Sequence, residues 1–297
     1  MKIDCEQAQQ AFFDYVHAYN AYNPRIALKI DHSLRVAKLC RTIAQNEEYS
    51  EDDCNLAWLI GLLHDIGRFE QLRIWNTFSD AQSISHAELS VKVLFEQTIN
   101  DATFNAEPNN TANILEHNFS SNLPASQIRL RRFVNSTQED DLIRCAIGYH
   151  SIFRLPDNLP ERTHNFCSIV RDADKLDILD TVQNSTPETI LNSTLEDLRD
   201  SPLSSAVIAA FNEKHCVRRQ DRHYPADFVV GFLCFVFELE HDTSILLALK
   251  SKSLLELAEH PFGMKEEFTN PATRQEFIRM KDELTAWLRY HQEKPTS

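Results

Sequence analysis

The sequence predicts an all-α protein, and three of its features lead to this fold class. Apolar residues recur at the spacing of amphipathic helices through most of the 297 residues. Good helix formers are plentiful, whereas only five glycines occur, too few for a turn-rich β-sandwich or a glycine-dependent dinucleotide fold. A hydrophobic content of 42% is enough for a substantial core without disulfide staples.

The expected helices are bounded by the places where the apolar spacing is lost. They cover roughly residues 6–20, 25–46, 52–67, 85–99, 140–152, 164–182, 187–199, 203–214, 225–239, 244–259 and 271–292. One start is well marked, because Thr186 can cap a helix, Pro187 suits its first turn and Glu188 complements its positive end.

Two parts are expected along the chain. Residues 1–182 are expected to form one helical domain, interrupted at about 100–135 by an irregular excursion rich in Asn, Ser, Thr and Pro. Residues 183–297 are expected to form a C-terminal helical subdomain packed on the first part. A second irregular zone, residues 214–225, precedes its most apolar helices.

The charge balance bears on the partners. Lys and Arg total 30 against 44 Asp and Glu, for a formal net charge of −14, which argues against general nucleic-acid binding. A small phosphorylated substrate stays compatible, because bound metal ions supply local positive charge. The oligomeric state is left open, and a homo-oligomer is one possibility.

The cellular location expected from the sequence is the cytoplasm. The seven cysteines are scattered and form no C-x-x-C pair, as in proteins with reduced thiols. Residues 1–10 lack the apolar stretch of a signal peptide, and the longest apolar run, 228–237, is too short to span a membrane.

An adjacent histidine and aspartate, His64 and Asp65, close one of the most apolar helices. A structural role would suffice for the pair taken alone, because a histidine suits the negative end of a helix and Gly67 could be its C-cap. Helical spacing, however, turns three more histidines inward on three other helices. These are His32, His86 and His150. Burying four imidazoles is costly, and a shared metal ion would satisfy several of them.

A later helix places two carboxylates beside an apolar stripe. The stripe is centred near Ala173, which leaves Asp172 and Asp174 on its two flanks. Spacing alone does not choose between them as a metal ligand.

Together, His32, His64-Asp65 and the Ala173-Asp174-Lys175-Leu176 segment resemble the HD superfamily of metal-dependent phosphohydrolases over about residues 25–182. The resemblance implies an HD-domain helical bundle. It also implies that His32, His64, Asp65 and Asp174 bind a divalent ion, with Asp172 as the alternative to Asp174.

Some branches of that family carry further histidines that bind a second metal. Ser85-His86-Ala87-Glu88-Leu89 and the segment ending in His150 look like those positions. Ser151 stands where some branches have another histidine, and the G-Y-P signature of cyclic-di-GMP hydrolases is absent. These departures argue against a full binuclear centre and a cyclic-dinucleotide substrate. His117, in the excursion, is a further candidate.

The resemblance implies hydrolysis of a phosphate ester of a small substrate, a nucleotide or a phosphodiester, by metal-activated water. One or two ions are expected among Mn²⁺, Fe²⁺, Ni²⁺, Co²⁺, Zn²⁺ and Mg²⁺, with Mn²⁺ or another transition metal favoured over Mg²⁺. Asp65 could bridge two metals or orient the water. Arg68 and Lys175 are expected to contact the phosphate, although a surface charge at a helix end explains each of them nearly as well.

Three other functions fit parts of the pattern. A regulatory module could keep the metal without turnover, and some proteins of the same scaffold use paired iron for oxidation. A helical interaction scaffold, with the histidines as core residues, would bind no metal.

Overall fold

The computed structural model describes residues 1–20, 22–95 and 129–293. Over these residues the secondary structure consists of α-helices and short 3-10 helices without a β-strand, so the predicted all-α class is confirmed. None of the described helices combines the length and the apolar character needed to cross a bilayer. His117 and most of the expected excursion at 100–135 lie outside the described residues.

The chain divides into two compact units. The first comprises Met1–Arg41, Tyr49–Ser151 and Leu159–Cys167, and the second comprises Thr42–Glu48, Ile152–Asn158 and Ser168–Ser297. The division cuts both helix α2 (Pro24–Asn46), after Arg41, and helix α7 (Glu161–Gln183), after Cys167, whereas the sequence placed a boundary after residue 182. That domain boundary stays a prediction.

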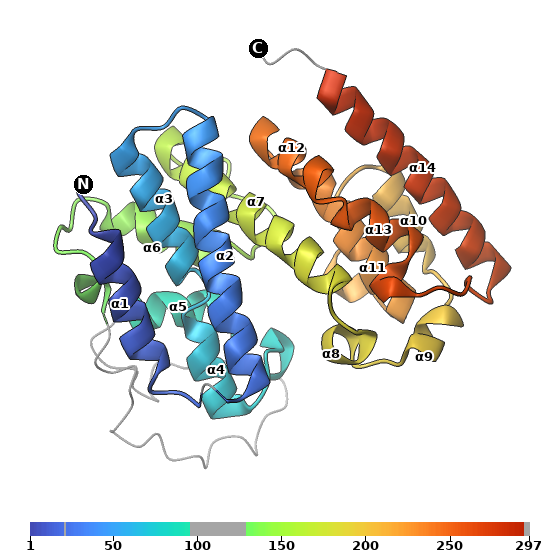
Figure 1. Ribbon diagram of the computed structural model, residues 1–297, viewed down its shortest axis with the longest axis horizontal. Helices are drawn as coiled ribbons and strands as arrows, with labels where there is room; N and C mark the ends of the chain where they lie inside the picture. The colour runs from blue at the N-terminus through green and yellow to red at the C-terminus, as the bar shows by residue number, and fades with distance from the viewer. Residues whose placement is uncertain (21, 96–128, 294–297) are drawn as a thin grey trace. The chain divides into compact units, whose positions relative to one another are not determined.

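Helices at the start of the chain build the first unit (Figure 1). They are α1 (Cys5–Val16), α2 (Pro24–Asn46) up to Arg41, α3 (Glu51–Leu63), α4 (Gly67–Trp75), α5 (His86–Phe95) and α6 (Asp140–Tyr149). α5 packs on both α4 and α6, and α3 packs on α1 and α6. This packing brings the helices that carry the candidate histidines together in one core.

The α3 helix is the apolar centre of the first unit. Ser50 caps it by accepting the Asp53 backbone N–H, and its acidic first turn suits the positive end of the helix dipole. Eight of its residues are buried, so it is covered on nearly all sides. A Cβ atom at Gly61 would lie 2.8 Å from the Ala37 Cα atom, so this glycine lets α3 approach the α2 backbone closely.

Aromatic residues of α1 pack on the helix that follows the His64-Asp65 pair. The rings of Phe12 and Tyr15 lie 6.1 and 6.0 Å from that of Phe69 on α4, in edge-on contacts. The Tyr15 hydroxyl donates to the Ile66 carbonyl oxygen, 3.4 Å away. The N-terminal helix thus supports the turn that carries Asp65.

The second unit contains the remaining helices. They are α8 (Pro187–Leu191), α9 (Leu195–Arg199), α10 (Ser205–Asn212), α11 (Pro225–Leu233), α12 (Asp242–Ser251), α13 (Ser253–Glu259) and α14 (Pro271–Glu293). α13 packs against α11, α12 and α14, and the long α14 also packs on α12 (Figure 1). Thr186 caps α8 by accepting the Thr189 backbone N–H, which confirms the start predicted there.

Several predicted helix boundaries were wrong. The helix expected over 52–67 ends at Leu63, and α4 occupies a stretch expected to be a loop. Gly67 is the first residue of α4 and not a left-handed C-cap. The helices expected over 187–199 and 244–259 are each divided in two, at Asn192 and Lys252, because these residues adopt left-handed conformations.

Candidate metal centre

The His64-Asp65 pair lies in the short turn between α3 and α4. His64 follows the last residue of α3 and is fully buried, and Asp65 is 2% exposed. Because α4 begins only two residues after Asp65, both side chains are held by helices on either side.

Gly67 brings α5 against this turn. A Cβ atom at this position would lie 2.5 Å from the Ser90 nitrogen and 2.9 Å from the His86 carbonyl oxygen, closer than real Cβ contacts. The Gly67 N–H also donates to the Ser90 hydroxyl oxygen at 2.9 Å. A glycine is therefore needed here for close helix packing, and that packing carries His86 to Asp65.

One pair of histidines faces the Oδ2 atom of Asp65. The Nε2 atoms of His32 on α2 and of His64 lie 3.2 Å apart. They lie 3.5 and 3.7 Å from Asp65 Oδ2. These three ligand atoms could hold one metal ion.

A second pair of histidines faces the other oxygen of the same carboxylate. The Nε2 atoms of His86 and His150 lie 3.0 Å apart, and they lie 3.6 and 3.7 Å from Asp65 Oδ1. These atoms form a second group that could hold an ion. The Asp65 carboxylate therefore lies between two histidine pairs. Its Oδ2 atom faces one pair and its Oδ1 atom faces the other.

Backbone carbonyls orient two of these rings. Nδ1 of His64 lies 2.7 Å from the Gly61 carbonyl oxygen, and Nδ1 of His150 lies 2.7 Å from that of Ile147. Because a carbonyl oxygen only accepts, each Nδ1 carries the ring proton. Each ring therefore turns its Nε2 atom toward Asp65.

A carboxylate orients the His86 ring. Asp80 Oδ2 lies 2.7 Å from Nδ1 of His86, which leaves the His86 Nε2 lone pair facing that of His150. Burial and the nearby Arg68 guanidinium lower the pKa of His86, which favours its neutral form at pH 7. Two lone pairs 3.0 Å apart repel each other unless a cation lies between them. A carboxylate behind a histidine is also the usual support of a metal ligand.

Asp65 carries the negative charge of the centre. Burial opposes its ionisation, but the positive charges of Lys29, above all, and of Arg68 hold the pKa of Asp65 well below its usual value. Its Oδ1 atom is buried and receives no hydrogen bond from any described residue. Such an oxygen is costly to bury without a partner, so a divalent ion fits the residues present.

Lys29 was not among the residues expected from the sequence. Its Nζ atom lies 2.6 Å from Asp65 Oδ2, so its ammonium group stands at the carboxylate oxygen that the His32 and His64 pair also faces. Lys29 precedes His32 by one helical turn on α2, and that spacing was the signal available in the sequence. Asp80 was missed because it begins a 3-10 helix of only three residues, which is too short to show a periodicity.

Arg68 lies beside Asp65. Its Nε atom is 3.4 Å from Asp65 Oδ1. Its Nη1 donates to the Phe78 carbonyl oxygen at 2.6 Å and lies 3.2 Å from Asp80 Oδ1. The guanidinium thus braces the loop that supports His86, and its expected contact with phosphate stays a prediction.

The other predicted residues lie on α7 within the second unit. Asp172 is fully buried and accepts the backbone N–H groups of Glu240 and His241 at 3.1–3.2 Å. Lys175 donates to the Glu238 carbonyl oxygen at 3.1 Å. These contacts give Asp172 a structural role. The ligand role of Asp174 and the catalytic role of Lys175 stay predictions.

One of the comparisons with known proteins found a family for this chain. The family model described as "HD domain" matches residues 30–181, about half of the chain. No curated protein and no solved structure matches the chain. The matched span includes the histidines and carboxylates described above. The chain therefore belongs to the HD domain family.

Proposed function

We propose that the protein is a metal-dependent phosphohydrolase that cleaves a phosphate ester of a small substrate, a nucleotide or a phosphodiester. One observation carries the proposal: two pairs of Nε2 atoms face the two oxygens of the buried Asp65 carboxylate. Membership of the HD domain family supports it, because that family consists mostly of metal-dependent phosphohydrolases.

The proposed centre holds two divalent ions. His32, His64 and Asp65 would hold one, and Asp65, His86 and His150 would hold the other. Asp174 would complete the set, because it stands at the last aspartate of the family pattern. Mixed histidine and carboxylate ligands suit Mn²⁺ or another transition metal.

Ions bound at such a centre polarise a phosphoryl oxygen and lower the pKa of a bound water toward neutrality. The side chains around them have their own tasks. Asp65, kept ionised by its cationic neighbours, would accept a hydrogen bond from the attacking water and orient it. Lys29 and Arg68 flank this carboxylate, and both could pair with the non-bridging oxygens of the phosphate.

The test begins with metal content. The protein is purified without chelators, and the metal in it is quantified. Release of p-nitrophenol from bis-p-nitrophenyl phosphate and of phosphate from mononucleotides is then followed with added Mn²⁺. Asp65→Ala should lose both metal and activity, whereas Asp14→Ala, which removes an exposed carboxylate on α1, should keep both.

The outcomes separate the candidate functions. About two ions per chain and Mn²⁺-dependent hydrolysis that is lost in Asp65→Ala support the proposal. Absence of bound metal refutes it and leaves a helical scaffold. Metal without hydrolysis points to a regulatory module, and oxygen consumption with iron but without phosphate release points to an oxygenase.

A further inference from the structure

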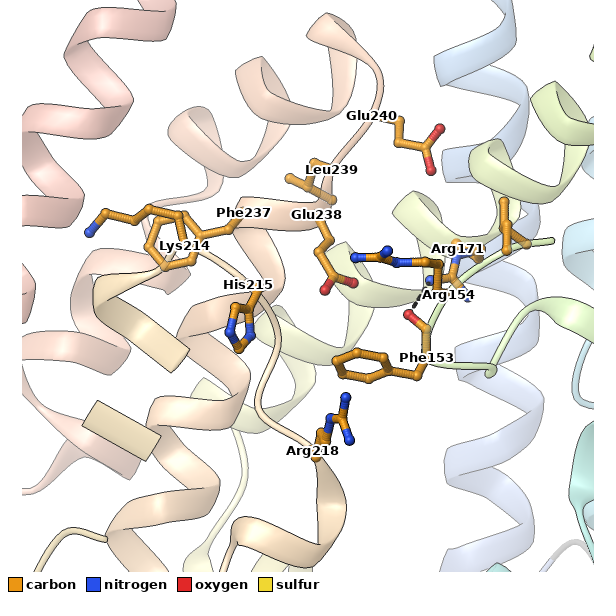
Figure 2. A pocket seen from close by; sticks show the side chains of 11 residues that line it. Phe153, Arg154, Arg171, Lys214, His215, Arg218, Phe237, Glu238, Leu239 and Glu240 are labelled. Atoms are coloured by element: carbon orange, nitrogen blue, oxygen red, sulfur yellow. Dashed lines mark hydrogen bonds between the residues drawn. The ribbon is translucent and has the colours of Figure 1, made fainter. Parts of the chain in front are cut away.

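The second unit contains a pocket of about 490 Å³. Its walls come from residues 153–155, from Arg171 on α7, and from the segments 214–218 and 237–240, whose side chains face one space in Figure 2. All of these residues belong to the second unit. The volume lies within the range of roughly 300–1,000 Å³ that is usual for small-molecule sites.

The side chains that line this pocket carry more positive than negative charge, whereas the whole chain is acidic. The protein has 44 acidic and 30 basic residues. The pocket, in contrast, is lined by four cationic side chains and two carboxylates. They are Arg154, Arg171, Lys214, Arg218, Glu238 and Glu240. A local excess of positive charge in an acidic protein favours an anionic ligand at that place.

Arg171 supports the wall that carries Phe153 and Arg154. It is 6% exposed, and its Nη1 and Nη2 atoms donate to the carbonyl oxygens of Ile152 and Phe153 at 2.5 and 3.4 Å. These bonds fix the backbone of the segment from behind. The side chains of Phe153 and Arg154 are therefore presented to the pocket by a held backbone (Figure 2).

Two of the four cations have no acidic partner among the residues that the structure describes. Lys214 pairs with Glu283 at 2.7 Å, so its charge is largely compensated. Arg154 and Arg218, by contrast, form no ion pair with any residue in the described part of the chain. Their guanidinium groups retain the paired donors that bind phosphate oxygens.

Glu238, one of the two acidic lining residues, is already engaged. Its Oε1 accepts the Cys216 backbone N–H at 3.0 Å, and its Oε2 lies 3.9 Å from the Lys175 ammonium. This carboxylate is therefore held by its neighbours, and it does not cancel the charge that Arg154 and Arg218 bring to the pocket.

An aromatic ring stands at the same wall. Phe153 is 45% exposed, and the Arg218 guanidinium carbon lies 5.4 Å from its ring centroid. A large ring that is half exposed beside arginine offers a stacking surface to a planar ligand. Stacking of a base on an aromatic side chain adds to affinity without requiring a particular base.

We propose that this pocket binds a small phosphorylated ligand with a planar ring, such as a nucleotide. Arg154 and Arg218 pair with its phosphate, and the ring stacks on Phe153. The site uses none of the histidines around Asp65, so the proposal does not depend on the proposed hydrolase activity.

Equilibrium binding of AMP, GMP, CMP and UMP to the full chain tests this site, with adenosine and inorganic phosphate as the two halves of the ligand. The chain carries Asp65→Asn and the buffer contains a chelator, so that neither bound metal nor turnover contributes. Chelator-treated wild-type protein is measured in parallel, in case the variant folds poorly. At least one mononucleotide should saturate the protein and bind more tightly than adenosine or phosphate alone.

Variants then locate the binding. Arg154→Gln and Arg218→Gln should each weaken mononucleotide binding roughly tenfold. Arg219→Gln, a neighbouring exposed arginine that does not line the pocket, should leave it unchanged. Phe153→Leu should weaken binding of the mononucleotide while leaving that of inorganic phosphate unaffected, because only the ring contact is removed.

Two results overturn the proposal: no saturable binding of any of the four mononucleotides, or equal weakening by Arg218→Gln and Arg219→Gln. Either can occur while the wild-type protein hydrolyses phosphate esters, which would leave the proposed function standing. Conversely, the variants could assign mononucleotide binding to this pocket in a protein that shows no hydrolytic activity. That result would support the proposed pocket site and refute the proposed hydrolase function.

Discussion

Asp80 supports a histidine of the candidate centre from behind, through its contact with Nδ1 of His86. Asp80→Asn should lower the affinity for one of two Mn²⁺ ions by about 10- to 100-fold, because the amide orients the imidazole less firmly and makes it a weaker ligand. Calorimetric titration of the chelator-treated protein with Mn²⁺ measures this change.

The matched control is Asp141→Asn, which removes an exposed carboxylate on α6. It should leave both binding steps unchanged. Equal affinities in Asp80→Asn and in the wild type would mean that Asp80 does not act through His86.

The Lys29 ammonium group forms an ion pair with the Asp65 carboxylate. Lys29→Met keeps the length of the side chain and removes its charge, so a divalent ion no longer competes with a cation for Asp65 Oδ2. The affinity for Mn²⁺ should rise roughly tenfold. Lys38→Met, on the exposed side of the same helix, serves as the control. A lower affinity in Lys29→Met would contradict the competition.

Helical spacing could identify some residues of the candidate metal centre from the sequence, but not those that only the fold brings to it. His32 and His86 are buried on helices and His150 is buried directly after the end of α6, and helical spacing predicted that all three turn inward. Asp80 begins a 3-10 helix of three residues, Asp80–Gln82, which is too short for a periodicity to mark a side chain that turns toward a buried ring. Lys29 looked like an ordinary helix surface residue, because only the fold shows that its ammonium reaches Asp65.

Gly67 lets α4 and α5 pack closely, and its replacement tests this contact between the two helices. Gly67→Ala places a methyl group within 2.5–2.9 Å of the α5 backbone, so it should lower the free energy of unfolding by about 1–3 kcal/mol and weaken metal binding. Gly148→Ala is the matched control. Its Cβ would meet the Val91 side chain at an ordinary 3.5 Å, and a helical alanine should add about 0.5–1 kcal/mol. Urea unfolding measures both changes.

Arg162 on α7 links two carboxylates of the first unit, Asp53 on α3 at 2.6 Å and Glu139 before α6 at 3.1 Å. Its hydrogen bond lowers the pKa of Asp53 below the usual 3.8. The stabilisation is therefore present above that pH, and it is lost as the pH falls through the lowered pKa. Because Arg162 is half exposed, Arg162→Gln should cost only about 0.5–1 kcal/mol at pH 7.

Urea unfolding of this variant and of the wild type at a series of pH values checks the expected trend. The difference between them should shrink steadily below pH 3.8. Arg289→Gln, on the exposed side of α14, should show no such trend. A difference that stays constant down to low pH would show that the ionised Asp53 carboxylate is not the partner that matters.

The helices themselves were mostly predictable, and the errors had a local cause. Apolar spacing located α2, α6, α7 and α14 to within a few residues. Gly67 was read as the end of a helix because glycine commonly ends one, whereas here it begins α4 and is needed for contact with α5. A contact with another helix leaves no trace in the local sequence, so α4 was missed.

Metal binding should increase the free energy of unfolding of the whole protein. An ion that binds only the folded chain adds about 2.7 kcal/mol at one hundred times its dissociation constant. Calorimetric melts should therefore show a higher transition temperature with Mn²⁺ than with a chelator. Asp65→Asn should melt at the same temperature in both. A shift of equal size in this variant would mean that the ion acts elsewhere on the chain.

The burial of Asp172 sets a limit on how the chain can be cut. Its carboxylate is fully buried and is satisfied by backbone N–H groups at Glu240 and His241, which follow it by almost seventy residues. A recombinant fragment that ends where the family match ends, at residue 181, would lack those donors. Its last helix would also lose most of the second unit, to which Asp172 belongs. A chain cut at residue 181 should therefore unfold at a lower urea concentration than the full chain.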